Sequence, residues 1–133
     1  MDKANDSARI VLKLDFGFGR DVGPGKVRLL ELIDEYGSIA AAGRAMGMSY
    51  RRAWLLVDNL NTSFAEAAVT TQLGGRGGGG AALTAFGRDL ANAYRDMERD
   101  ARNAVEDRLL ALEETVRRGF MASHERVEAR PDA

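Results

Sequence analysis

The sequence predicts a mainly α-helical fold with a small β component, in which a winged helix-turn-helix precedes a long C-terminal helix. Three observations predict this class. Two helical patterns meet at a short turn that contains Gly47 and Ser49. A glycine-rich loop over residues 74–80 separates two short stretches of strand composition. Apolar residues then recur every three or four positions over residues 85–118, which is the period of a helix with one apolar face.

The composition is that of a globular protein without disulfides. The chain has 133 residues, enough for one domain with its own core, and 45% of them are hydrophobic. It has no cysteine, which excludes disulfides and cysteine metal sites. No apolar run approaches the roughly 20 residues of a membrane span, and the first residues do not resemble a signal peptide. We therefore expect a cytoplasmic protein with no membrane partner.

Arginine is concentrated in one part of the chain. The formal net charge is -1, but residues 38–88 hold five arginines against two acidic residues. Residues 1–37 and 89–133 both hold more acidic than basic side chains. Because the local charge decides whether a surface attracts a polyanion, this distribution favours residues 38–88 as a nucleic-acid-binding surface.

The N-terminal part predicts a strand, a loop and a helix. We expect residues 1–8 to be disordered. Residues 9–16 alternate, which predicts a strand with one buried face; that face holds Ile10, Leu12, Leu14 and Phe16. Glycines make residues 17–25 a loop, and Pro24 suits the start of a helix. Residues 26–36 predict an amphipathic helix that Gly37 ends; its apolar face holds Leu29, Leu32, Ile33 and Tyr36.

Two capped helices follow, and they form the predicted helix-turn-helix. Ser38 can cap the first helix, Gly47 can take the left-handed conformation that ends it, and Ser49 can cap the second. In the second helix the apolar stripe is Ala53, Leu56, Val57 and Leu60, which directs Arg51, Leu55, Asp58 and Thr62 outward. Leu55 is apolar at an exposed position, so either a neighbouring element covers it or it contacts a ligand. The alternative for the whole stretch is an ordinary pair of packed helices.

A hairpin completes the predicted DNA-binding domain, which we place at residues 9–83. Residues 69–73 and 81–83 predict paired strands, and the flexible loop between them holds Arg76. After a helix-turn-helix such a hairpin is a wing, whose glycines let the backbone approach DNA closely. The alternative is a nucleotide-phosphate loop, which is disfavoured because no Gly-Lys-Ser/Thr follows.

Residues 84–119 predict a long dimerisation helix that Thr84 caps. A helix of this length exceeds what one small domain can bury, so its far end should pair with a second copy in a homodimer. The predicted interface residues are Leu90, Met97, Val105, Leu109, Leu112 and Val116. The alternative is a solvated helix held by charge pairs such as Asp96–Arg99 and Glu98–Arg102. We expect residues 120–133 to be a disordered tail.

The candidate DNA contacts gather around the second helix of the pair. Base contacts concentrate in the first turn of such a helix, and arginine can donate two hydrogen bonds to guanine. The predicted DNA-binding residues are Ser38, Ser49, Tyr50, Arg51, Arg52, Trp54 and Arg76. Arg51 is preferred over Arg52 because it points further outward, although both suit a merely solvated face. Trp54 equally suits partial core packing, and Ser38 equally suits a plain cap.

Nothing in the sequence indicates catalysis. His124 is the one histidine, and no carboxylate–histidine cluster has metal-ligand spacing. We therefore expect neither an enzyme, nor a metal site, nor a cofactor.

The residues also resemble a known family. S-Y-R-R-A-W-L-L-V-D-N-L-N resembles the recognition helix of the molybdenum-dependent transcriptional regulators, or ModE-like proteins, and G-G-R-G-G-G-G-A-A-L-T-A-F-G is similar to their wing and the segment after it. The N-terminal domain of LysR-type regulators is a more distant resemblance. The likeness covers about residues 9–118. Full-length members carry C-terminal β domains that bind molybdate, and residues 120–133 could not form them, so the resemblance implies a DNA-binding half that uses a separate sensor protein or has lost sensing.

The leading hypothesis is a homodimeric, sequence-specific transcription regulator that binds double-stranded DNA and is linked to molybdenum or oxyanion metabolism. Two alternatives remain open. One is a protein-interaction winged-helix module that does not bind DNA, which the near-neutral total charge favours. The other is a direct anion-responsive switch that uses the glycine loop.

Overall fold

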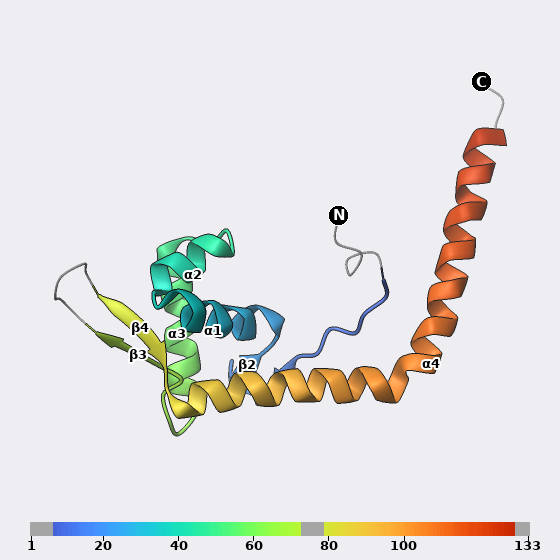
Figure 1. Ribbon diagram of the computed structural model, residues 1–133. Coiled ribbons are helices and arrows are strands. Elements are labelled where there is room, and N and C mark those ends of the chain that lie inside the picture. The colour runs from blue at the N-terminus through green and yellow to red at the C-terminus, as the bar shows by residue number, and fades with distance from the viewer. Residues whose placement is uncertain (1–6, 73–78, 130–133) are drawn as a thin grey trace. The chain divides into compact units, whose positions relative to one another are not determined.

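The computed structural model describes residues 7–72 and 79–129, and it is mainly helical with two small antiparallel sheets and a long C-terminal helix, as predicted. Figure 1 shows the elements, which are β1 (Leu14–Asp15), β2 (Asp21–Val22), α1 (Pro24–Tyr36), α2 (Ile39–Ala45), α3 (Tyr50–Ser63), β3 (Val69–Gln72), β4 (Gly80–Leu83) and α4 (Ala85–Ala129). The chain forms two compact units. One is Val11–Glu98, and the other joins Met1–Ile10 to Arg99–Ala133.

Helix α1 ends at the predicted residue and begins at Pro24, two residues before the predicted range of 26–36. Pro24 occupies its first turn, where the missing N–H is not needed. Gly37 ends it with φ of 68°, and the Gly37 N–H donates to the Ile33 carbonyl at 2.8 Å. Tyr36 is exposed, so its predicted place on the buried face is wrong. It is the last residue of α1, where the helix leaves the core.

Helices α2 and α3 cross closely at a short turn. The expected caps are confirmed: the Ser38 hydroxyl accepts from the Ala41 N–H, and the Ser49 hydroxyl accepts from the Arg52 N–H, each at 3.1 Å. Gly47 has a φ of 71°, the left-handed conformation predicted for it. A Cβ at Gly43 would lie 3.0 Å from the Cβ of Ala53, so glycine at this position permits the close approach.

The second sheet is the predicted hairpin, with Val69 opposite Leu83 and Gln72 opposite Gly80. Asn61 ties the hairpin to α3, because its side-chain oxygen accepts from the N–H groups of Ala68 and Val69 at 2.8 and 3.0 Å. Leu73 and most of the predicted loop, residues 74–78, lie outside the described residues.

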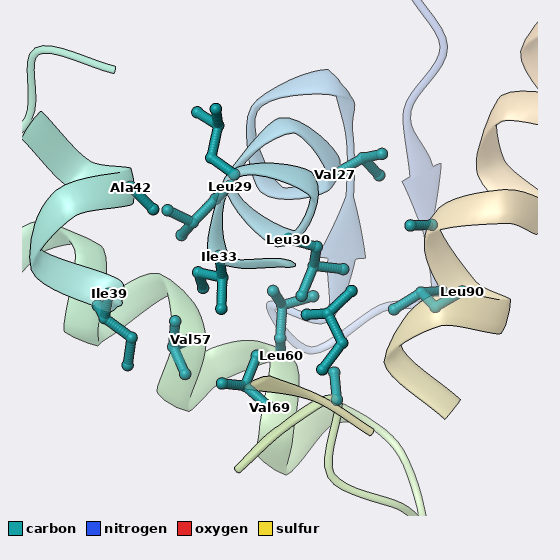
Figure 2. Packing of buried hydrophobic residues seen from close by; sticks show 14 of the residues in the cluster. Val27, Leu29, Leu30, Ile33, Ile39, Ala42, Val57, Leu60, Val69 and Leu90 are labelled. Carbon is teal, nitrogen blue, oxygen red and sulfur yellow. The ribbon is translucent and has the colours of Figure 1, made fainter. Parts of the chain in front are cut away.

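The core of the Val11–Glu98 unit is apolar and is built around α1. Figure 2 shows Leu30 and Ile33 of α1 facing side chains from α2, α3, β3 and the start of α4. Tyr94 is fully buried, and its hydroxyl donates to the Leu12 carbonyl at 2.8 Å. Over the described ranges no polar or charged residue is buried. Burial of these apolar side chains therefore holds the helices and the hairpin together.

The strand predicted over residues 9–16 is much shorter in the structure. The predicted alternation of burial holds through Leu14, but only Leu14 and Asp15 pair, with Val22 and Asp21. Strand β2 is too short to pair with more residues because α1 begins at Pro24. Phe16 is 55% exposed, so its predicted burial is also wrong. It precedes a tight turn in which Gly17 and Gly19 have positive φ.

Helix α4 is longer than predicted. It continues to Ala129, so the expected disorder is wrong for residues 120–129. A single glycine in a helix, here Gly119, costs only about 1 kcal/mol, and the first proline after it is Pro131. No helix in the described part of the chain is long and apolar enough to cross a membrane.

The second unit places the N-terminal segment against this helix. The Ala8 N–H donates to a carboxylate oxygen of Glu113 at 2.7 Å, and Arg102 donates to the Ala8 carbonyl at 2.8 Å. Ala8 is therefore ordered, whereas residues 1–6 of the predicted disordered N-terminus lie outside the described residues. Within the Val11–Glu98 unit, Glu98 accepts from Arg95 at 2.9 Å.

Candidate nucleic-acid interface

The first turns of α3 carry exposed polar side chains away from the core. Ala53, Val57 and Leu60 are buried, at the spacing of one helix face. Arg51 lies on the opposite face and is exposed, and so are Ser49 and Arg52 in the first turn. The outward direction predicted for Arg51 is therefore confirmed.

The arginines of α2 and α3 are exposed. Within the described ranges, Arg44, Arg51 and Arg52 form no ion pair. By contrast, Lys26 contacts Asp21 at 2.9 Å, and Arg95 contacts Glu31 at 2.8 Å. The three exposed guanidinium groups add positive charge to the exposed surfaces of α2 and α3.

An open groove joins the candidate residues of α2 and α3 to the hairpin. Its lining side chains and backbone come from Ser38, Ile39, Ala40, Tyr50, Trp54, Thr71, Gln72, Gly79, Gly80 and Ala81. Tyr50 and Trp54 meet edge to face, with ring centroids 6.3 Å apart. The structure thus brings Ser38, at the start of α2, to the same groove as Tyr50 and Trp54 of α3.

Trp54 is 37% exposed, so it is neither a core residue nor a freely solvated one. Its ring contacts that of Tyr50, and Trp54 is also one of the residues that line the groove. Ser38 lies at the same groove, and its hydroxyl is engaged in the helix cap.

The hairpin is docked beside Ser38 by backbone contacts. The Ala81 N–H donates to the Gly37 carbonyl at 2.9 Å, and a Cβ at Gly80 would lie 3.5 Å from that same oxygen. Thr71 and Gln72 then line the groove, although sequence reasoning did not select them. The sequence did contain a signal for Thr71 and Gln72, because polar residues in so short a strand indicate that the strand has an exposed face.

The other predicted residues are Arg76 and those proposed for dimerisation. Arg76 lies outside the described residues. Leu90 is buried in the core of the Val11–Glu98 unit, so it is not available for the dimerisation role predicted for it. Leu112 and Val116 of α4 are exposed in the single chain, Met97 is exposed as well, and Val105 and Leu109 are half-buried.

The described residues contain no group of three or more histidine, aspartate or glutamate side chains that could hold a metal ion. His124 is exposed on α4, and its ring lies 4.5 Å from that of Phe120, centroid to centroid.

Comparison with known proteins found similar sequences among proteins named for molybdenum and among proteins named as transcriptional regulators. The chain is 38% identical over 98 residues, 74% of its length, to the molybdenum transport protein ModE of Azotobacter vinelandii. It is 44% identical over 80 residues, 60% of its length, to the molybdenum-pterin-binding protein MopB of Rhodobacter capsulatus. It is 34% identical over 87 residues, 65% of its length, to the DNA-binding transcriptional dual regulator ModE of Escherichia coli K12.

These matches cover 36%, 30% and 33% of the respective relatives, so the chain spans about a third of the length of the relatives it matches. No family model matches the chain.

Proposed function

The chain is ModE-like over the region that it shares with these relatives, and on that basis we propose that it is a cytoplasmic, sequence-specific DNA-binding transcription regulator linked to molybdenum metabolism. The observation that carries the proposal is the exposed face of α3 with its unpaired arginines, beside the groove that the hairpin completes. The names of the relatives support both halves of the proposal, because one is named for molybdenum transport and another for DNA-binding regulation.

In this proposal α2, α3 and the hairpin act as a winged helix-turn-helix. The N-terminal turns of α3 enter the major groove, where Arg51 donates two hydrogen bonds to the O6 and N7 atoms of a guanine. Arg52 and Ser49 contact the same major groove of the DNA or the phosphates beside it. The groove between α3 and the hairpin receives one sugar-phosphate backbone, with Tyr50, Trp54 and the start of α2 as its contacts.

The protein acts as a homodimer through the second half of α4. Leu112 and Val116 are exposed there at a spacing of four residues, and Leu109 lies one turn before Leu112. Pairing of two such helices removes these side chains from water. A dimer presents two copies of α3, which read half-sites about 10 base pairs apart or at a multiple of that spacing.

The direct test is selection of binding sites from random double-stranded DNA, followed by titration of the selected site. We expect sequence-preferring binding that weakens steeply as salt rises, because phosphate contacts release counterions. The Arg51→Ala variant should bind with relaxed preference at one base pair of each half-site, a loss of about 1–3 kcal/mol of discrimination.

The matched control is Arg117→Ala, which removes an exposed arginine of α4 outside the candidate interface. It should keep the wild-type site preference. Failure to select any sequence, with weak binding that is equal for all DNA, would contradict the proposal. A stable complex with another protein and no DNA affinity would favour the interaction-module alternative.

A further inference from the structure

Leu55 is an apolar side chain in the middle of the exposed face of α3. It is 56% exposed, and no described element covers it. It lies one helical turn after Arg51 and one turn before Asp58, so the three side chains share one face. The first of the two explanations left open by the sequence, a covering neighbour, is therefore removed for the described part of the chain.

The chemistry of the major groove suggests what Leu55 contacts. Base edges there present hydrogen-bond donors and acceptors, together with one apolar group, the 5-methyl of thymine. Leucine has no hydrogen-bonding side-chain atom, so among these base-edge groups the methyl is the one that matches it. On the basis of the proposed function, we infer that Leu55 contacts a thymine methyl group and so specifies a T in each half-site.

The helix geometry limits where that thymine lies. Leu55 lies four positions after Arg51, which is about 6 Å along the axis of α3 at 1.5 Å per residue. Stacked bases are about 3.4 Å apart along one strand. The thymine should therefore lie within about two base pairs of the guanine that Arg51 reads.

The aromatic residues of α3 do not compete for this role. Tyr50 and Trp54 contact each other and line the groove beside the hairpin. Leu55 is not among the residues that line this groove. Its contact should therefore be separable from theirs by substitution.

The test is a cycle of base and side-chain substitutions on the selected site. Each thymine is replaced in turn by deoxyuridine, which lacks only the 5-methyl group, and the dissociation constant is measured for the wild type and for Leu55→Ala. We expect the wild type to lose about fourfold in affinity at one thymine per half-site, which corresponds to the roughly 0.8 kcal/mol of one buried methyl group. The Leu55→Ala variant should be insensitive at that position and keep its sensitivity elsewhere.

Two controls make the result specific. Val11→Ala truncates an exposed apolar residue outside α2 and α3, and it should keep the wild-type deoxyuridine profile. Leu55→Met retains an apolar side chain and should keep most of the sensitivity. Because Leu55 is not part of the core, both Leu55 variants should unfold at the wild-type denaturant concentration.

The outcomes separate the inference from the proposed function. A Leu55→Ala variant that selects DNA and retains the full wild-type deoxyuridine profile overturns the thymine contact and leaves the regulator proposal intact. The thymine contact is also overturned if the critical thymine lies more than a few base pairs from the guanine whose preference is lost in Arg51→Ala. A wild-type protein without any sequence preference overturns both.

Discussion

Gly87 and Gly119 lie in the same helix, α4, and have opposite surroundings. A Cβ at Gly87 would lie 2.1 Å from the carbonyl oxygen of Ala68, whereas one at Gly119 would have nothing within 4 Å. Gly87 is needed because Thr84 holds the start of α4 against this backbone: the Thr84 N–H donates to the Ala68 carbonyl at 2.9 Å. The requirement at Gly87 thus comes from packing and not from an unusual backbone conformation.

Replacing Gly87 with alanine should destabilise the protein. The atom in its way is backbone and cannot rotate aside, so we expect the free energy of unfolding to fall by about 1–3 kcal/mol, the usual range for overpacking. Urea denaturation followed by circular dichroism measures it. Gly119→Ala, the control, should not lower stability, because alanine is favoured over glycine in a helix by about 1 kcal/mol. Equal effects of the two substitutions would contradict this account.

At single residues the sequence predicted local features well and packing poorly. The caps at Ser38 and Ser49 and the left-handed Gly47 were predictable because each depends on a few neighbouring residues. The outward direction of Arg51 followed from the helix period. The burial of Leu90 did not, because it depends on which side of α4 the core occupies.

Among the elements, α1 and the first part of α4 are linked by an ion pair. Arg95 donates to both carboxylate oxygens of Glu31, at 2.9 and 2.8 Å. Hydrogen bonds from the Arg95 guanidinium hold the pKa of Glu31 below its usual value of 4.5. Burial of the Glu31 carboxylate has a smaller effect that raises the pKa. The two groups are about one-third exposed, so solvent screens part of this attraction.

Replacing Glu31 with glutamine should lower stability in a pH-dependent manner. The pKa of Glu31 is lower in the folded than in the unfolded protein, so its contribution is fully present above about pH 4.5 and is lost as pH falls through the folded pKa. We expect a loss on the order of 1 kcal/mol at pH 7 that shrinks toward zero in acid. Urea denaturation across this pH range measures the difference from the wild type.

Glu114→Gln is the matched control for that prediction. Glu114 is an exposed residue of α4 that pairs with Arg117 within the same helix. Its replacement should change the free energy of unfolding by no more than about 0.5 kcal/mol. A Glu31→Gln variant that is as stable as the wild type at pH 7 would argue against a stabilising link between α1 and α4.

Element types were predictable, and their lengths were less so. The apolar periods of residues 26–36 and 53–60 indicated α1 and α3 because one face of each is buried. The alternation of residues 9–16 described burial correctly, but a strand also needs a partner, and β2 offers only two residues. The end of α4 was missed because a polar sequence without proline is compatible with either a helix or a disordered tail.

For the whole molecule, the division into units crosses α4. The helix contributes its start to the Val11–Glu98 unit and its remainder to the other unit. The predicted boundary at residue 83 or 84 followed the change of secondary structure, whereas the compact unit continues through Leu90 and Tyr94. The proposed dimer uses the part of α4 beyond this unit.

Replacing Leu112 with glutamate should dissociate the proposed homodimer. Leu112 is 65% exposed in the single chain, and pairing of two copies would otherwise bury its side chain. A carboxylate in such an interface would be buried without a partner, which costs several kcal/mol. We expect sedimentation velocity to show a dimer for the wild type and a monomer for Leu112→Glu, with weaker binding to a two-half-site DNA.

The control for dissociation is Asn103→Glu, which places the same charge at an exposed position of α4. By the helix period, Asn103 lies on the face opposite Val105, and it should leave the protein dimeric. A wild-type protein that sediments as a monomer at all concentrations would contradict the homodimer.

The intrinsic fluorescence of Trp54 can report on the groove beside the hairpin. It is the chain's one tryptophan, and its partly exposed indole lies among the lining residues. Emission from an indole depends on the polarity around the ring, so any occupant of the groove, whether a duplex or a small anion, changes the signal. Occupancy of this surface can therefore be followed in the unlabelled protein.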